Sequence, residues 1–236
     1  MLIMAMVPAG ADDTRALYQT QCASCHGEAR LGGIGPALLP SNLSRLKPSA
    51  AEVVIRDGRP ASQMPAFGEQ LDEGQIASLA EWIYRAPEVE PTWGRDEILD
   101  SQAVIHPDGS LPDVPRFDAD PLNLFIVVET GDHHASLLDG DTFERIHRFE
   151  TRYALHGGPK YTPDGRHVFF GSRDGWITKY DIYNMEVVAE VRAGINMRNI
   201  AVSGDGRYVM AANYLPHSLV LFDAHNLDMM KVYPVV

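Results

Sequence analysis

The stretch Cys22-Ala23-Ser24-Cys25-His26 decides how the first half of this chain folds. Two cysteines spaced C-x-x-C and followed at once by a histidine form the attachment motif of a c-type haem. In such a motif the thiols of Cys22 and Cys25 add to the two vinyl groups of the porphyrin, and His26 reaches the iron from one face. The motif therefore predicts a covalently bound haem c.

Three other uses of a C-x-x-C pair fit this sequence less well. A zinc site needs about four ligands, and Cys22 and Cys25 are the only cysteines in the chain. A thioredoxin-like redox pair belongs to a βαβ unit and requires no adjacent histidine. A disulfide between the two cysteines is compatible with the spacing but leaves His26 unexplained. Covalent haem accounts for all three residues.

The residues before the motif indicate export. Residues 1–11 (MLIMAMVPAGA) are apolar and end in small side chains, as in the second half of a secretory signal with its cleavage site. The positively charged start of such a signal is missing, so we interpret these residues as a signal-peptide remnant. A disordered apolar terminus is the alternative. Because c-type haem is normally attached outside the cytoplasm, we expect a location in the bacterial periplasm.

The composition argues against two kinds of partner. A formal net charge of -12 at pH 7 leaves no basic face to neutralise phosphates, so nucleic acid is not expected. No stretch reaches the ~20 apolar residues that span a bilayer. We expect a small redox protein as the electron partner.

Residues 12–86 predict a small all-α domain. Asp13, Ser49 and Asp72 are the expected N-caps of three short helices, the last two within capping boxes. The third helix carries one apolar face at helical spacing, formed by Ile76, Leu79, Ala80 and Ile83. Three short helices give a very small core, and a covalently held haem is the kind of staple that such a domain needs.

Met64 lies between the second and third expected helices, in an irregular loop next to Pro65. A thioether opposite His26 completes the coordination of a haem iron, raises its reduction potential and keeps it low-spin. A methionine taken alone is more often gap-filling packing. With a haem already predicted, we expect Met64 as the sixth ligand, and hence electron transfer at this haem. This half of the chain resembles the small class I cytochromes c.

Residues 87–121 contain six prolines among acidic residues and few apolar runs. This composition predicts a stiff proline-rich linker.

Residues 122–236 change to a β-strand pattern that repeats. One turn motif occurs at 163–166 and again at 204–207, and a second marker recurs at Asp139, Asp181 and Asp223. A repeat of roughly 40 residues with about four strands is typical of a β-propeller blade. Buried strands are expected at 124–128, 168–170 and 208–211.

The length of the repeat region gives fewer blades than a closed propeller needs. Residues 122–236 hold fewer than three such repeats, whereas closed propellers have about four to eight blades. We therefore expect an N-terminal fragment that ends within an incomplete all-β propeller, in its first two to three blades. The predicted fold class is multidomain, with a small all-α cytochrome c domain preceding that propeller.

His156 precedes the first turn motif, Arg173 follows it, and Arg198 lies one repeat after His156. Residues that enter the inner strand of a blade face the propeller axis, so we expect these three side chains to converge there. An imidazole binds the iron of a tetrapyrrole, and guanidinium groups pair with its carboxylates. Taken singly, a residue such as His156 is more often a hydrogen-bonded loop histidine, and such arginines are more often surface charge. From these residues alone, both interpretations stay open.

The order of the domains, with LFIVVE (124–129) and LHGGPKYTPDGRHVFFGSRDGWITKYDIY (155–183), resembles the cytochrome cd1 group. That group comprises the nitrite reductases and their NirN-type and NirF-type relatives, with an eight-bladed propeller around haem d1. The resemblance implies that His156 is the proximal ligand of the d1 iron. It also implies that Arg173 and Arg198 lie by the d1 carboxylates and that Tyr214 lines the pocket.

Within the group the chain is most similar to the NirN-type dihydro-haem d1 dehydrogenases. The sequence at 156–160 differs from the Ser/Arg-rich segment usual in nitrite reductases, the second repeat is compact, and the haem c motif counts against the NirF type. The resemblance implies a periplasmic oxidoreductase of haem d1 biogenesis, in denitrification. It implies that a propionate of dihydro-haem d1 is oxidised to an acrylate and that the electrons pass to haem c.

The implied cofactors are haem c and, in the full-length protein, haem d1 or its dihydro precursor. A cytochrome cd1 nitrite reductase is a further possible partner. No catalytic base stands out, and we expect it in later blades, so that the fragment alone is inactive. Two alternative functions stay open: a cytochrome cd1 nitrite reductase that forms nitric oxide, and a simple electron-transfer cytochrome c whose β extension docks a partner.

Overall fold

The computed structural model describes residues 11–235, which divide after Pro91 into two compact units with separate hydrophobic cores. Residues 1–10, nearly all of the expected signal-peptide remnant, lie outside the described part of the chain. Within residues 11–235 no helix is both long and apolar enough to cross a bilayer.

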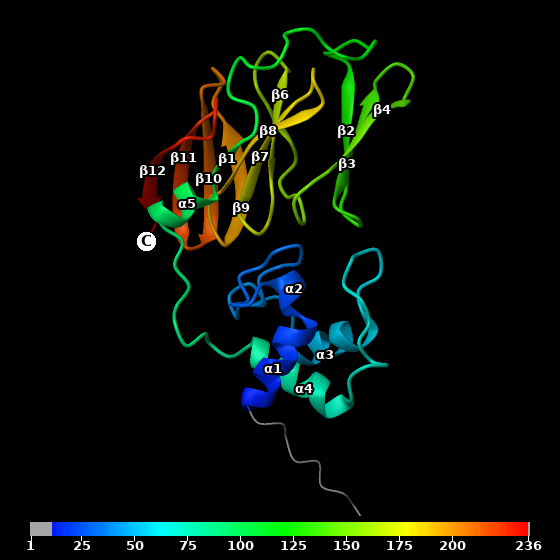
Figure 1. Cartoon of the computed structure of the whole chain (residues 1–236), viewed down its shortest axis with the longest axis vertical. Helices are drawn as coiled ribbons and strands as arrows, with labels where there is room; N and C mark the ends of the chain where they lie inside the picture. Colours follow the sequence, from blue (N-terminus) through cyan, green and yellow to red (C-terminus); the bar gives the residue numbers. More distant parts are fainter. Residues whose placement is uncertain (1–10, 236) are drawn as a thin grey trace, which may run out of the picture. The chain divides into compact units, whose positions relative to one another are not determined.

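The first unit is helical. Its described residues form α1 (Ala11–Gln21), α2 (Ala23–His26), α3 (Pro48–Asp57) and α4 (Glu73–Ile83), joined by irregular loops (Figure 1). The predicted apolar face of α4 is confirmed, since its four residues are at most 5% exposed. They pack with Tyr18 of α1 and Ile55 of α3 in one cluster, so the core depends on the meeting of three helices.

The start of α4 follows the sequence prediction. The Asp72 carboxylate accepts a hydrogen bond from the backbone N of Gln75 at 2.9 Å, and the Gln75 side chain accepts one from the backbone N of Asp72 at 3.0 Å. The predicted capping box is therefore confirmed.

The other two predicted N-caps are wrong. Helix α3 begins at Pro48 with Lys47 as its N-cap and no side-chain cap bond, so Ser49 lies inside the helix. Proline fits the first helical position because its φ is already helical and its missing N–H has no partner there. Helix α1 begins at Ala11, which places Asp13 inside its first turn.

The segment predicted as a stiff linker is folded over part of its length. It contains α5 (Arg95–Ser101) and β1 (Ala103–Val104), and β1 pairs with β8 of the second unit. Ile98 is fully buried in the core of that unit. Trp93 donates from Nε1 to the Arg192 carbonyl at 2.9 Å. Ile98 and Trp93 thus attach this segment to the second unit, although its prolines and acidic residues predicted a stiff linker.

Three antiparallel sheets form the rest of the second unit, and Figure 1 shows them side by side in chain order. The first has the strand order β2-β3-β4, the second β1-β8-β7-β6-β5 and the third β12-β11-β10-β9. The bounds are β2 Leu124–Glu129, β3 His134–Asp139, β4 Arg145–Glu150, β5 Lys160–Tyr161, β6 His167–Gly171, β7 Trp176–Asp181, β8 Glu186–Arg192, β9 Asn196–Val202, β10 Tyr208–Leu215, β11 His217–Asp223 and β12 Met229–Pro234.

The predicted sequence repeat corresponds to these sheets. The predicted strands at 124–128, 168–170 and 208–211 lie in β2, β6 and β10, which confirms them. Each predicted Asp-Gly turn joins the first two strands of a sheet, with Gly165 and Gly206 both at a φ of 73°. The arrangement is propeller-like, because sheets of one pattern follow each other and pack face to face.

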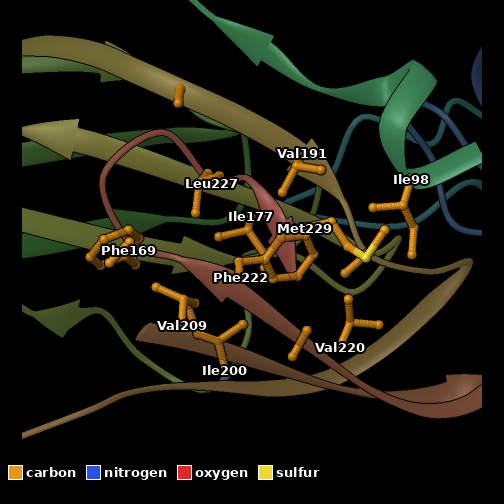
Figure 2. Packing of buried hydrophobic residues seen from close by; sticks show 14 of the residues in the cluster. Ile98, Phe169, Ile177, Val191, Ile200, Val209, Val220, Phe222, Leu227 and Met229 are labelled. Atoms are coloured by element: carbon orange, nitrogen blue, oxygen red, sulfur yellow. The ribbon is translucent and has the colours of Figure 1, made fainter. Parts of the chain in front are cut away.

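The middle sheet is buried on both faces because side chains alternate along a strand. In β6, Val168 and Phe170 pack in one cluster with Leu137 of the first sheet, and Phe169 packs in another with the third sheet. Figure 2 shows this second cluster, in which side chains of both sheets and Ile98 of α5 gather together. This packing fixes the strand ends near which the predicted site residues lie, His156 and Arg173 in loops, Arg198 in β9 and Tyr214 in β10.

Candidate functional site

The C-x-x-C-H motif forms one helical turn. The backbone N atoms of Cys25 and His26 donate to the Cys22 carbonyl at 3.1 and 2.9 Å. Positions three apart on a helix are neighbours, so the two thiols lie on the same side of the turn. Both cysteines are free and partly exposed, as attachment to a porphyrin edge requires.

The Cys22 thiol is not activated in the way that a redox pair requires. Burial, together with the nearby Cys25, raises the pKa of the Cys22 thiol to about 11. Reactive thiol pairs instead have a lowered pKa, because the thiolate is the nucleophile. Within residues 11–235 no group of three or more His, Cys, Asp and Glu side chains is arranged to hold a metal ion.

His26 is held in the orientation that an iron ligand needs. It is buried, and its Nδ1 donates to the Pro36 carbonyl at 2.8 Å. Because a carbonyl can only accept, Nδ1 carries the proton and Nε2 keeps its lone pair. Burial lowers the pKa of His26, which favours the neutral imidazole. Such a second hydrogen bond fixes the tautomer and ring orientation of metal-bound histidines.

The loop after the motif is shaped around this imidazole. Gly35 donates its backbone N–H to the Cys25 carbonyl at 2.8 Å. A Cβ atom added at Gly35 would lie 2.8 Å from Cε1 and 3.0 Å from Nδ1 of His26. The loop therefore requires glycine at this position, which the sequence marked only as part of a glycine-rich segment.

Met64 lies in a loop anchored to the end of α3. The backbone N atoms of Phe67 and Gly68 donate to the Ile55 and Arg56 carbonyls at 3.0 and 2.9 Å. The Met64 side chain is half-buried against the same hydrophobic cluster that Cys22 contacts. Met64, the predicted sixth ligand, therefore lies against the same hydrophobic core as the Cys22–His26 turn.

In the second unit, His156 lines a pocket between the first two sheets. The pocket has a volume of about 190 Å³, and its other walls include Val128 and Thr130 from the end of β2 and Phe170 of β6. The His156 backbone N donates to the Gly171 carbonyl at 2.7 Å. This bond ties the histidine loop to the end of β6.

Arg173 and Arg198 converge on His156. Arg198 donates from Nη1 to Nε2 of His156, so Nε2 is the nitrogen with the lone pair. Burial and the charges of Arg173 and Arg198 lower the pKa of His156, which keeps it neutral near pH 7. The Arg173 carbonyl accepts from the Met197 backbone N at 3.0 Å, which joins the two arginine segments. Three predicted site residues therefore lie together.

Within residues 11–235, Tyr214 does not line the His156 pocket of about 190 Å³. It lies near the end of β10 and is 50% exposed. Val128 and Thr130 were not predicted as pocket residues. They lie one repeat period before Phe170 and Ser172. The sequence repeat could therefore have predicted Val128 and Thr130 as pocket residues.

Two family models match the chain, one for each unit. The model described as "Cytochrome C oxidase, cbb3-type, subunit III" matches residues 9–83. The model described as "Cytochrome D1 heme domain" matches residues 119–236, which is half of the chain. The chain belongs to the cytochrome D1 heme domain family. In this family member, a cytochrome c-type unit precedes the D1 unit.

Relatives of this family member match both units at once. The dihydro-heme d1 dehydrogenase of Pseudomonas aeruginosa is 57% identical over 99% of this chain and 48% of its own length. The nitrite reductase of Stutzerimonas stutzeri is 26% identical over 93% of this chain and 42% of its own length. The chain thus spans about half the length of these curated relatives.

A solved structure agrees with these sequence matches. The dihydro-heme d1 dehydrogenase NirN in complex with DHE is 58% identical to this chain, with a TM-score of 0.88. The similarity covers 94% of this chain and 48% of that one. The described fold is therefore close to that of about half of a d1-family dehydrogenase.

Proposed function

We propose that this chain serves in a dihydro-haem d1 dehydrogenase, an oxidoreductase that completes haem d1 in the bacterial periplasm. The observation that carries the proposal is the 57% identity to such an enzyme across 99% of this chain, against 26% to a nitrite reductase. Because the chain spans about half of these relatives, the activity is proposed for a protein of their full length that carries both units.

The helical unit is proposed to bind haem c. Cys22 and Cys25 would form the thioether bonds, and His26 and Met64 would be the axial ligands. This role is supported by the free thiols on one turn, the neutral buried imidazole with Nε2 as acceptor, and the shared cluster that Met64 and Cys22 contact. With both axial positions filled, haem c accepts and releases one electron at a time.

The pocket at His156 is proposed to receive the tetrapyrrole. His156 would bind its iron through Nε2, Arg173 and Arg198 would pair with its carboxylates, and Tyr214 would line the pocket. Arg198 donates to that same Nε2, so iron binding requires the guanidinium to leave it. A carboxylate of the arriving substrate offers Arg198 a new partner, which couples substrate binding to the release of His156.

The proposed reaction turns a CH2–CH2 group of a propionate side chain into the CH=CH group of an acrylate. Two C–H bonds break, one C–C π bond forms, and two protons and two electrons leave. Bound haem c would supply one-electron transfer, so the two electrons would leave singly and reduce two one-electron equivalents of an oxidised small redox protein. A base must take a proton from carbon, and we propose that it belongs to later blades of the propeller.

The architecture is proposed as a cytochrome c domain over residues 12–86 and an eight-bladed d1 propeller whose first blades are the three sheets. The packing of the middle sheet on both faces supports a ring of blades. The C-x-x-C-H motif supports a periplasmic location, since haem attachment takes place there.

The test uses the full-length protein, matured with haem c, and supplies dihydro-haem d1 and nitrite in separate reactions. With dihydro-haem d1, we expect the long-wavelength absorption bands to shift to those of haem d1 while haem c is reduced. No spectral change with dihydro-haem d1, together with nitric oxide from nitrite, would replace the proposal with nitrite reduction. A single haem c spectrum with no tetrapyrrole binding would leave only electron transfer.

A further inference from the structure

The loop between His26 and α3 is closed by Arg30, a residue that the haem motif does not include. The Arg30 backbone N donates to the Gly27 carbonyl at 3.0 Å, and its carbonyl accepts from the Leu38 backbone N at 2.9 Å. Residues 27–38, called here the attachment loop, are thus pinned at Arg30. Pro36, whose carbonyl holds His26, lies inside this loop.

The Arg30 side chain ties the attachment loop to the end of α4. Its Nη1 donates to the carbonyls of Trp82, Ile83 and Arg85 at 3.2, 3.0 and 3.1 Å, and Nη2 donates to the Arg85 carbonyl at 3.1 Å. The last carbonyls of a helix lack a full set of partners within the helix and carry partial negative charge. A guanidinium presents several donors in one plane, so a single side chain serves three carbonyls at this helix end.

Arg30 is also buried against an aromatic ring. It is 5% exposed, and its guanidinium lies 4.7 Å from the centre of the Trp82 ring. Tyr18 contacts the same ring and donates from its hydroxyl to the Gly27 carbonyl at 2.7 Å. The attachment loop is therefore fastened to α1 and α4 by two buried side chains.

The backbone at Arg30 shows that this position is costly for an arginine. Its φ is 63°, in the left-handed region that side chains other than glycine and asparagine rarely adopt. A buried cation is also unfavourable unless it is well paired. The hydrogen bonds of the guanidinium to the end of α4 offset the cost of the left-handed backbone and the cost of the buried charge.

From these contacts we propose that Arg30 is a positioning residue for haem c. It fixes the attachment loop on α4 and so holds the Pro36 carbonyl against Nδ1 of His26. The proposal rests on the haem c site proposed above. A hydrogen bond at Nδ1 makes the imidazole a stronger donor at Nε2, which favours the oxidised iron. Arg30 thereby helps to set the reduction equilibrium of haem c.

The test compares Arg30→Lys and Arg30→Met in the whole, haem-loaded protein. Lysine keeps the charge, but its point-like ammonium cannot bridge the three carbonyls, whereas methionine removes the charge as well. Arg85→Met is the matched control, because Arg85 belongs to the same helix end and its exposed side chain pairs with Glu81. Covalent haem is first measured in the wild type by mass spectrometry, and folding of each variant by circular dichroism.

We expect Arg30→Lys to shift the reduction equilibrium of haem c toward the ferrous form by at least about threefold. We also expect the His26 Nδ1 proton to exchange with solvent at least about tenfold faster, as measured by NMR. Arg85→Met should change neither quantity. Should Arg30→Met not fold, Arg30→Lys alone decides the outcome.

Unchanged equilibrium and exchange in a folded Arg30→Lys variant would overturn the proposal and leave the haem c site standing. A shift confined to Arg30→Met would also overturn it, since charge alone would then be responsible. A wild type without covalent haem would overturn the haem c site and this proposal together.

Discussion

At the scale of single residues, Gly35 leaves no room for a side chain beside the His26 ring. A Cβ at Gly35 lies 2.8 Å from an imidazole carbon, closer than non-bonded carbon atoms approach each other. We expect Gly35→Ala to displace the ring, break its bond to the Pro36 carbonyl and reduce the low-spin fraction of haem c. Visible and EPR spectra measure this fraction.

A matched control for this substitution is Gly204→Ala, because a Cβ at Gly204 meets nothing within 4 Å. It should leave the haem c spectra as in the wild type. A Gly35→Ala protein with unchanged spectra would contradict the described position of the His26 ring.

His167 makes the second unit sensitive to acid. Burial and the charges of Lys179 and Arg166 lower the pKa of His167 to about 4, against the opposing effects of Asp181 and Asp164. In the unfolded chain the imidazole titrates near pH 6.5. Between these values the unfolded chain binds more protons, so the free energy of unfolding falls as the pH drops from about 6.5 toward 4.

We therefore expect His167→Gln to flatten the loss of stability between pH 7 and pH 4. Urea unfolding at a series of pH values, followed by tryptophan fluorescence, measures this slope. An equal slope in the variant and the wild type would show that His167 is not the group responsible.

At the scale of elements, the two helix starts make a matched pair. Asp72 accepts the cap bond of α4, whereas Ser49 lies inside α3 and caps nothing. We expect Asp72→Ala to lower the free energy of unfolding of the helical unit by about 1 kcal/mol. Ser49→Ala should leave it nearly unchanged. Denaturant unfolding followed by circular dichroism tests both, and an equal loss in the two variants would contradict the assigned caps.

The predictions at α3 and α4 differ in outcome for a local reason. Both sequences contain a Ser or Asp followed three residues later by Glu or Gln, but only α3 has a proline directly before the serine. Proline at the first helical position moves the start of the helix earlier, so the serine no longer has the extended backbone that an N-cap needs. Pro48 therefore already indicates, in the sequence, that Ser49 is not the N-cap of α3.

At the scale of the whole molecule, the stability of the second unit depends on packing between sheets. Phe169 is fully buried between the second and third sheets. We expect Phe169→Ala to lower the free energy of unfolding by about 3–5 kcal/mol, since large aromatic cavities in cores cost this much. Phe143 is 67% exposed, and Phe143→Ala should cost less than about 1 kcal/mol. Equal melting temperatures for the two variants would contradict a shared core between the sheets.

Features that depend on neighbours in the chain could be predicted from the residues alone. The C-x-x-C-H turn, the apolar face of α4 and the strands that recur with the blade period all follow from local spacing, because helix and strand periods are set by the backbone. The repeat also placed His156 and Arg198 at corresponding positions, which the fold brings into contact.

Features that join distant segments became visible only in the folded chain. Arg30 contacts the carbonyls at the far end of α4, and Trp93 donates to the Arg192 carbonyl. Tyr214, by contrast, does not line the His156 pocket in the described part of the chain. Such pairings follow from which buried groups must find hydrogen-bond partners once helices and sheets have packed. Residue spacing does not encode them, because burial is a property of the assembled fold.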